Sequence, residues 1–88
     1  MNTLVNGLAK AVDFDDDNMW VELTDGRKLG VPLVYFPRLL NASEVARKDF
    51  VISGGGIGIH WESLDEDISV EGLLLGIGDR SRPRAEAA

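Results

Sequence analysis

Two alternating stretches on either side of an Asp-Gly pair constrain the fold of this chain most strongly. Residues 19–24 and 28–33 alternate apolar with polar or bulky side chains, which is typical of strands with one buried face. Asp25-Gly26 between them favours a type I′ turn, whose two central positions both need positive φ. The sequence therefore predicts an antiparallel hairpin with Trp20 facing outward. The inward positions of its strands are Met19, Val21, Leu23, Leu29, Val31 and Leu33.

The segments on either side extend this hairpin. Residues 8–14 predict an earlier strand, with Lys10 interrupting its apolar face, and the polar run 15–18 is typical of a turn. Pro32 has no N–H to donate, so the strand at 28–33 is expected at an edge of the sheet or ending there. Pro37 is expected in the first turn of a short helix, and Ser43 as the N-cap of another that runs to Lys48.

The C-terminal half is expected to add a hairpin and a helix. Residues 50–52 and 57–61 flank a Ser-Gly-Gly-Gly run and predict either a hairpin or one bulged strand. The alternation places Ile57, Ile59 and Trp61 on one face, and His60 on the other. Ser69 is expected to cap a helix whose apolar residues recur at i, i+3, i+4 and i+7. These residues are Val70, Leu73, Leu74 and Ile77, and Gly76 and Gly78 stand at the end of the expected helix.

These elements predict an α+β fold: a small antiparallel sheet of hairpins, with short helices and a C-terminal helix packed on it. With 88 residues, the chain is long enough for one hydrophobic core. We expect a single domain at 1–78 and a flexible Arg/Ala tail at 79–88, where no apolar pattern continues. The core is expected to contain Met19, Val21, Leu23, Leu29, Val31, Ile59, Trp61, Leu73 and Leu74.

Cysteine content and hydropathy bear on the compartment. The chain has no cysteine, so disulfides and thiolate chemistry are excluded, and a reducing cytoplasm is the expected location. The N-terminus has neither the basic leader nor the apolar run of a secretory signal. No apolar stretch approaches the roughly 20 residues that a membrane span needs, so no membrane association is expected.

The charge distribution excludes one class of partner and favours another. The net charge is −6, and the last ten residues contribute +1 through three arginines against Asp79 and Glu86, which leaves −7 for residues 1–78. Such a body repels phosphate backbones, because nucleic-acid binding relies on clustered cations. No direct nucleic-acid binding is expected. A small basic protein is the expected partner, and a homo-oligomer is left open.

Motifs for nucleotides, metals and covalent catalysis do not fit. The glycines at 54–56 lack the lysine of a phosphate loop and lead into a strand rather than a helix. Three aspartates at 13, 15 and 17 match the start of a calcium loop, but Asn18 stands where that loop needs glycine and Thr24 where it needs glutamate. One histidine without cysteine gives too few nitrogen and sulfur ligands for zinc. The sequence predicts no cofactor and no metal.

Residues 60–67 bring a base, an aromatic ring and several carboxylates close together in sequence. Catalysis, contact with a ligand or partner, and a structural role are all open for this segment, because acid–base work depends on spacing and pKa values that sequence does not give. The structural alternative places Trp61 in the core and Asp67 as a cap of the helix that Ser69 begins, with Glu66 also near its positive N-terminus. We expect binding or structure, since the histidine has no cysteine or serine elbow to activate.

Several motifs together resemble a known family. They are GIHW at 58–61, LDEDIS at 64–69, the Asp-Gly pair at 25–26 and the segment 32–40. Over about residues 8–75 the chain resembles the bacterial family called domain of unknown function 2442. The resemblance implies a small α+β domain like the N-terminal domain of a Nitrosomonas protein of unknown function. Some relatives carry a helix-turn-helix after this domain, for which about ten residues beyond the last expected helix are too few.

The resemblance also suggests a role, since members are often encoded beside another small protein in what have been suggested to be toxin–antitoxin-like pairs. An acidic chain fits the neutralising member of such a pair, because charge complementarity steers association with a basic protein. The sequence therefore predicts a non-catalytic protein–protein interaction module and not an enzyme. The rivals are an inhibitor of a phage or defence system that binds a basic surface, a ligand-sensing domain, and a small hydrolase using residues 60–67. The candidate partner-binding residues are Trp20, Tyr35, His60, Asp65 and Glu66.

Overall fold

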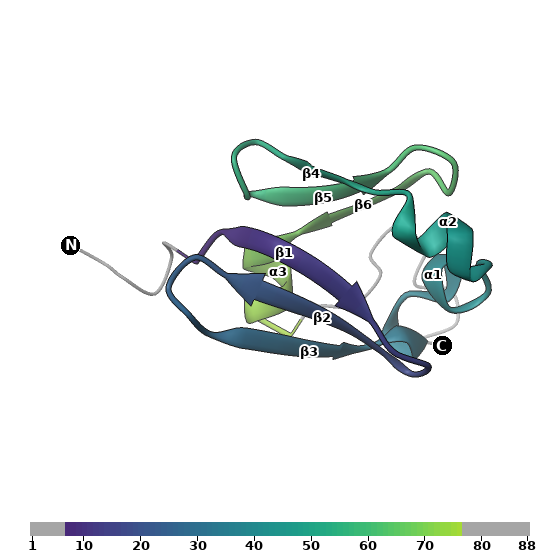
Figure 1. Ribbon diagram of the computed structural model, residues 1–88, viewed down its shortest axis with the longest axis horizontal. Helices are drawn as coiled ribbons and strands as arrows, with labels where there is room; N and C mark the ends of the chain where they lie inside the picture. Colours follow the sequence, from purple (N-terminus) through teal and green to yellow (C-terminus); the bar gives the residue numbers. More distant parts are fainter. Residues whose placement is uncertain (1–6, 77–88) are drawn as a thin grey trace, which may run out of the picture.

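A computed structural model describes residues 7–76, and Figure 1 shows how their elements are arranged. The strands form two antiparallel sheets of three strands each. Sheet A contains β1 (Ala9–Phe14), β2 (Asn18–Leu23) and β3 (Lys28–Pro32), and sheet B contains β4 (Val51–Ser53), β5 (Gly58–Trp61) and β6 (Glu66–Ser69). Between the sheets in sequence come the 3₁₀ turn η2 (Leu33–Tyr35) and helices α1 (Pro37–Leu40) and α2 (Glu44–Lys48), and after β6 comes α3 (Val70–Leu74).

The α+β fold class is confirmed, with the hairpins divided between two sheets. Strand order follows chain order in both sheets. Helices α1 and α2 connect β3 of sheet A to β4 of sheet B and lie at one end of the molecule, on the right in Figure 1. Helix α3 packs behind sheet A and against β6. The last two residues of the predicted domain, 77 and 78, and the predicted tail at 79–88 lie outside the described residues.

A β-bulge corrects the face of β1. The pairing of β1 with β2 shifts register between Ala9 and Ala11, so Lys10 is an extra residue that the ladder does not pair. The bulge lets Ala9 face the core together with Val12 and Phe14, although these residues differ in parity, and Lys10 stays exposed. After the bulge, Val12 and Phe14 turn toward the core and pack against it. The lysine that interrupted the apolar pattern in the sequence thus marks the irregularity.

The turn between β2 and β3 differs from the predicted type I′ turn. Among the described residues outside glycine, Asp65 alone has positive φ, so Asp25 does not have the required conformation, whereas Gly26 has φ of 94°. Gly26 N–H donates to the Leu23 carbonyl at 3.0 Å, and Leu23 N–H donates to the Arg27 carbonyl at 2.8 Å. These bonds define a three-residue turn that ends in a left-handed glycine. The Asp25 carboxylate stabilises it by accepting from Arg27 N–H at 3.0 Å.

The predicted core is largely confirmed. Seven of its members are buried, namely Met19, Val21, Leu23, Val31, Ile59, Trp61 and Leu73, and Leu29 and Leu74 pack half-buried against them. The inward position predicted for Leu33 is also confirmed. The prediction that Ile57 shares a face with Ile59 and Trp61 is wrong, because Ile57 lies in the turn before β5 and is 61% exposed. The core also includes Ala9, Phe36, Leu39, Ile68 and Val70.

Three predictions about helix ends are confirmed. Pro37 is the first residue of α1, the Ser43 hydroxyl accepts from Ala46 N–H at 3.1 Å, and the Ser69 hydroxyl accepts from Gly72 N–H at 2.9 Å. Helix α3 is shorter than predicted and ends at Leu74. Gly76, with φ of 77°, follows it in the left-handed conformation that commonly ends helices.

Hydrogen bonds of Trp61 and Arg47 connect sheet B to helices α1 and α2. The Trp61 indole N–H donates to the Arg47 carbonyl of α2 at 2.8 Å. The Arg47 side chain in turn donates to the carbonyls of Leu39 at 2.7 Å and Leu40 at 2.8 Å, at the end of α1. The role predicted for Trp61 as a core residue therefore includes a polar anchor, as buried indoles usually require.

Candidate functional site

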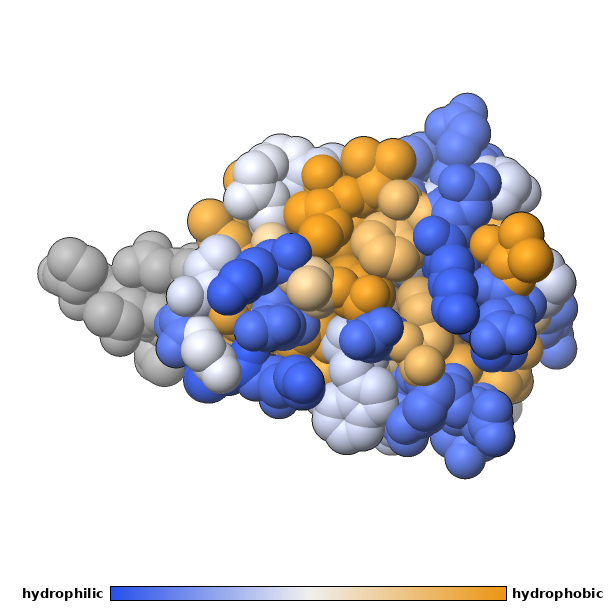
Figure 2. Space-filling model, viewed as in Figure 1, coloured by the Kyte–Doolittle hydropathy of each residue, from blue (hydrophilic) through white to orange (hydrophobic). Residues whose placement is uncertain are grey.

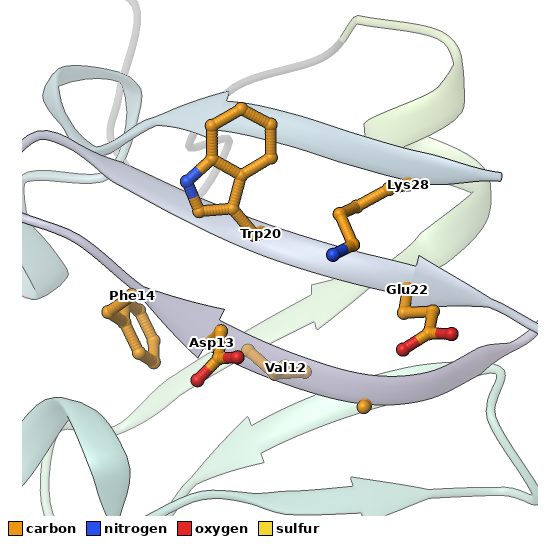
Figure 3. A pocket seen from close by; sticks show the side chains of 7 residues that line it. Val12, Asp13, Phe14, Trp20, Glu22 and Lys28 are labelled. Atoms are coloured by element: carbon orange, nitrogen blue, oxygen red, sulfur yellow. The ribbon is translucent and has the colours of Figure 1, made fainter.

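The outer face of sheet A carries an open groove, shown in Figure 3. Strand alternation sends Met19, Val21 and Leu23 of β2 inward, and therefore sends Trp20 and Glu22 outward. The groove has a volume of about 520 Å³, which is within the range of small-molecule sites. Its lining consists of Ala11, Asp13, Trp20, Glu22 and Lys28, together with Val12 and Phe14 of the edge strand β1, whose side chains point to the opposite face.

Trp20 forms the aromatic wall of this groove and lies over β3 (Figure 3). It is the cross-strand partner of Gly30. A Cβ atom at position 30 would lie 2.5 Å from Trp20 Cζ3 and 2.8 Å from Cη2, so the ring rests directly on the glycine backbone. Gly30 is needed here for close approach, since its φ is not in the left-handed region.

A hydrogen bond fixes the other edge of the ring. Trp20 Nε1–H donates to Asp15 Oδ2 at 2.8 Å. The second oxygen, Oδ1, accepts from the backbone N–H groups of Asp17 at 2.9 Å and Asn18 at 2.7 Å. The bond from the Trp20 indole, followed by the bond from Asp17 N–H, lowers the pKa of Asp15 below its ordinary value of 3.8. The β1–β2 turn therefore holds the indole in place with a charged carboxylate.

Charge is divided unevenly along the groove. At one end, Lys10 Nζ lies 3.8 Å from Glu22 Oε2, and Lys28 pairs in register with Glu22. At the other end, Asp13 is the cross-strand partner of Trp20, and the β1–β2 turn adds three further aspartates, Asp15 to Asp17. Within residues 7–76, no lysine or arginine forms an ion pair with any of these four aspartates. The Trp20 end is therefore acidic and the Lys28 end is mixed.

A second, apolar surface adjoins the groove along β1. Val51 of β4 is 61% exposed, and Phe14, Phe50 and Ile52 are half-buried beside the core. The Phe14 and Phe50 rings lie 6.4 Å apart between centroids, which joins the two sheets at this place. Figure 2 shows apolar side chains gathered over β1 and β4, with hydrophilic ones around them.

His60 lies on the outer face of sheet B between two carboxylates. Its Nε2 is 3.0 Å from Glu62 Oε1, and its Nδ1 is 3.5 Å from Asp67 Oδ1. The hydrogen bond with Glu62, and then the charge of Asp67, raise the pKa of His60 above its ordinary value of 6.5. The helix-capping role predicted for Asp67 is wrong, because residues 66–69 form strand β6, where Asp67 pairs across to His60. Ser69 alone supplies the side-chain cap of α3.

The two acidic candidates beside His60 have different surroundings. Asp65 is exposed in the β5–β6 turn with φ of 52°, and its carbonyl accepts from Arg38 Nη1 at 2.7 Å. Glu66 is 3% exposed, and its Oε1 lies 3.8 Å from the same guanidinium nitrogen. Strand alternation turns the Glu66 carboxylate into the molecule toward Arg38. The partner-binding role predicted for Glu66 stays a prediction.

Tyr35 lies apart from Trp20 and His60. It is 59% exposed in η2 and lines a second hollow of about 250 Å³ between β3 and α3. The structure therefore does not bring the predicted candidates together in one site. Sequence reasoning missed Asp13, Glu22 and Lys28 as groove residues. The alternation that turned Trp20 outward could have found Glu22 and Lys28, and alternation with Val12 and Phe14 could have found Asp13.

Two classes of site are not seen in the described part of the chain. Residues 7–76 contain no group of three or more histidines, cysteines or carboxylates arranged to hold a metal ion. None of their helices is long and apolar enough to span a membrane.

These features define a small α+β domain of two antiparallel sheets with an open, acidic-sided groove on one face. Residues 9–79 match the family described as Protein of unknown function (DUF2442), and the chain belongs to this family. The resemblance found in the sequence motifs is thereby confirmed. Comparison with curated proteins gives no match.

Two solved structures share the fold. A protein of unknown function from Rhodospirillum rubrum is 31% identical, with a TM-score of 0.74, and the alignment covers 85% of this chain and 93% of that chain. An uncharacterized protein from Chromobacterium violaceum is 24% identical, also with a TM-score of 0.74, over 91% of this chain and 75% of that chain. The second likeness shows the fold alone.

Proposed function

We propose that this chain is a non-catalytic protein–protein interaction module that binds a basic protein through the groove on the outer face of sheet A. The observation that carries the proposal is the Trp20 ring, held between Gly30 and Asp15 and lining an open groove. Rigid aromatic side chains are enriched at binding hot spots, since they bury a large area and lose little entropy. The apolar surface at Val51 and Phe14 extends the footprint available to a partner.

Charge supports a basic partner. The described acidic side chains exceed the basic ones, and several of the basic ones already form ion pairs within the chain: Lys10, Arg27, Arg38 and Lys48. The aspartates around Trp20 have no such pairs. A positively charged surface would be attracted to this end during encounter, which raises the association rate at low salt.

The surroundings of His60 support the absence of catalysis. Both ring nitrogens face carboxylates, and its pKa is raised, so the imidazole holds its proton more tightly and presents no uncommitted nitrogen. A general base needs a free nitrogen and a proton to take from the substrate. These features favour a structural or binding role over the small hydrolase.

We propose further that the partner is encoded beside this chain, which would then act as the neutralising, antitoxin-like member of a bacterial two-gene module in the cytoplasm. The proposal rests on the acidic surface and on the gene pairs suggested for the family. A ligand sensor and an inhibitor of a phage or defence system are the alternative outcomes of the test below.

The test measures binding of the purified neighbouring gene product by calorimetry at about 0.05 and 0.3 M salt. We expect a complex that weakens with salt, because the attraction is electrostatic. Ala11→Arg adds bulk and positive charge to the groove and should weaken binding at least about tenfold, which is about 1.4 kcal/mol. Ser63→Arg adds the same charge in the exposed β5–β6 turn and should bind like wild type.

Other results would refute parts of the proposal. Loss of binding in Ser63→Arg but not in Ala11→Arg would place the partner near His60. Absence of binding to the neighbouring product would refute the two-gene module. A turnover that His60→Ala abolishes without changing the melting temperature would establish an enzyme.

A further inference from the structure

The Trp20 ring offers a partner one kind of contact. One face of the indole rests on Gly30, and the Nε1–H is already donated to Asp15. The ring therefore has no free donor, and what it presents to the groove is the surface of its π system. The face of an indole ring is electron-rich and attracts cations more strongly than the face of phenylalanine or tyrosine does.

A carboxylate on the neighbouring strand β1 is available to a cation. Asp13 lies across from Trp20 on the outer face and is exposed. Its carboxylate forms no hydrogen bond or ion pair with any residue in the range 7–76. Of the two nearby lysines, Lys10 forms an ion pair with Glu22, and Lys28 is the cross-strand partner of Glu22. No lysine or arginine among the described residues pairs with the Asp13 carboxylate.

We infer that the groove receives an arginine side chain of the protein partner, with its guanidinium stacked on Trp20 and paired with the Asp13 carboxylate. This inference rests on the proposed function and specifies the chemistry of the partner. Arginine fits better than lysine because its planar group can stack on a flat ring and bond a carboxylate through two N–H groups at once. A phosphate or carboxylate of a ligand would be repelled by Asp13 and the aspartates of the β1–β2 turn.

The test uses three blocked tripeptides, Gly-X-Gly, in which X is arginine, lysine or the neutral isostere citrulline. Each is titrated at millimolar concentration into the ¹⁵N-labelled full chain. We expect the arginine peptide to cause saturable shifts of the Trp20 indole and Asp13 amide signals. Citrulline should leave both signals in place, and lysine should bind several-fold more weakly.

A matched pair of variants tests the role of Asp13. Asp13→Asn should weaken binding of the arginine peptide about two- to fivefold, the worth of one exposed ion pair. Glu71→Gln removes the same charge from the exposed first turn of α3 and should bind like wild type. Neither side chain forms an ion pair in the described chain, so both variants should keep the fold.

Two results would overturn the arginine assignment: equal weakening by Asp13→Asn and Glu71→Gln, which shows attraction to the whole acidic body, or equal shifts from citrulline and arginine. Its failure is distinguishable from failure of the proposed function. If Ala11→Arg prevents binding of the neighbouring gene product but no arginine-specific shift occurs, the groove is the binding site and the arginine assignment is wrong. If the peptide binds at Trp20 but the neighbouring protein does not bind, the arginine site stands and the partner is wrong.

Discussion

Gly30→Ala tests the close contact that holds the Trp20 ring. The new Cβ would lie 2.5 Å from Trp20 Cζ3, which is closer than non-bonded carbon atoms can approach. Because the contacting atoms are at the far end of the side chain, we expect the ring to swing off β3 rather than the strand to move. This motion would break the indole bond to Asp15 and remove the flat wall of the groove.

The expected change in stability follows from two opposing terms. Overpacking costs roughly 1–3 kcal/mol, and the lower part of that range, about 1–2 kcal/mol, applies here because the half-buried ring can move outward. Replacing a strand glycine by alanine contributes about 0.5–1 kcal/mol in the other direction, through the lower entropy of the unfolded chain. Gly30→Ala should therefore destabilise wild type by roughly 0–1.5 kcal/mol. In a Trp20→Ala background the same change should stabilise the fold by about 0.5–1 kcal/mol.

The assay is urea unfolding of the four proteins in this cycle, followed by circular dichroism. The expected coupling between positions 20 and 30 is about 1–2 kcal/mol. In Gly30→Ala the pKa of Asp15 should also rise toward 3.8, because the first cause of its lowering is the Trp20 bond. A coupling below about 0.5 kcal/mol, together with an unchanged indole signal, would refute the contact.

Three further predictions concern the core, the cap of α3 and the histidine. Leu73 is 7% exposed and Leu75 68% exposed, so Leu73→Ala should cost about 2–5 kcal/mol and Leu75→Ala less than about 0.5 kcal/mol in urea unfolding. Ser69→Ala should lower the free energy of unfolding by about 0.5–2 kcal/mol because it removes the bond from Gly72 N–H. Asp67→Ala should leave the melting temperature near wild type. It should lower the pKa of His60 in an NMR titration, because the charge of Asp67 raises that pKa. Since the pKa of His60 is raised above 6.5 by folding, its contribution to stability is present in full below 6.5 and is lost as the pH rises through the folded-state pKa. His60→Gln should thus be less stable than wild type at about pH 5.5, with the gap closing by about pH 8.5; a gap that widens with pH would contradict the observed pairing.

Local patterns in the sequence determined the elements that depend on neighbouring residues. Alternation at 19–24 placed Met19, Val21 and Leu23 inside and Trp20 outside, because successive strand residues point to opposite faces. The hydroxyls of Ser43 and Ser69 marked two helix starts, since a cap bonds N–H groups only a few residues away. The motifs at 58–61 and 64–69 also identified the family from the sequence alone.

The tertiary structure alone decided which segments meet. In the sequence, Glu66 and Asp67 precede a helix start and resemble residues that cap it. Pairing with β5 instead makes residues 66–69 a strand, which buries Glu66 and places Asp67 against His60. Gly30 is an ordinary strand glycine until the register sets Trp20 on top of it. The groove likewise required the pairing of β1 with β2, which sets Asp13 opposite Trp20. Register and sheet pairing join residues distant in sequence, and their energies come from long-range packing that no local window contains.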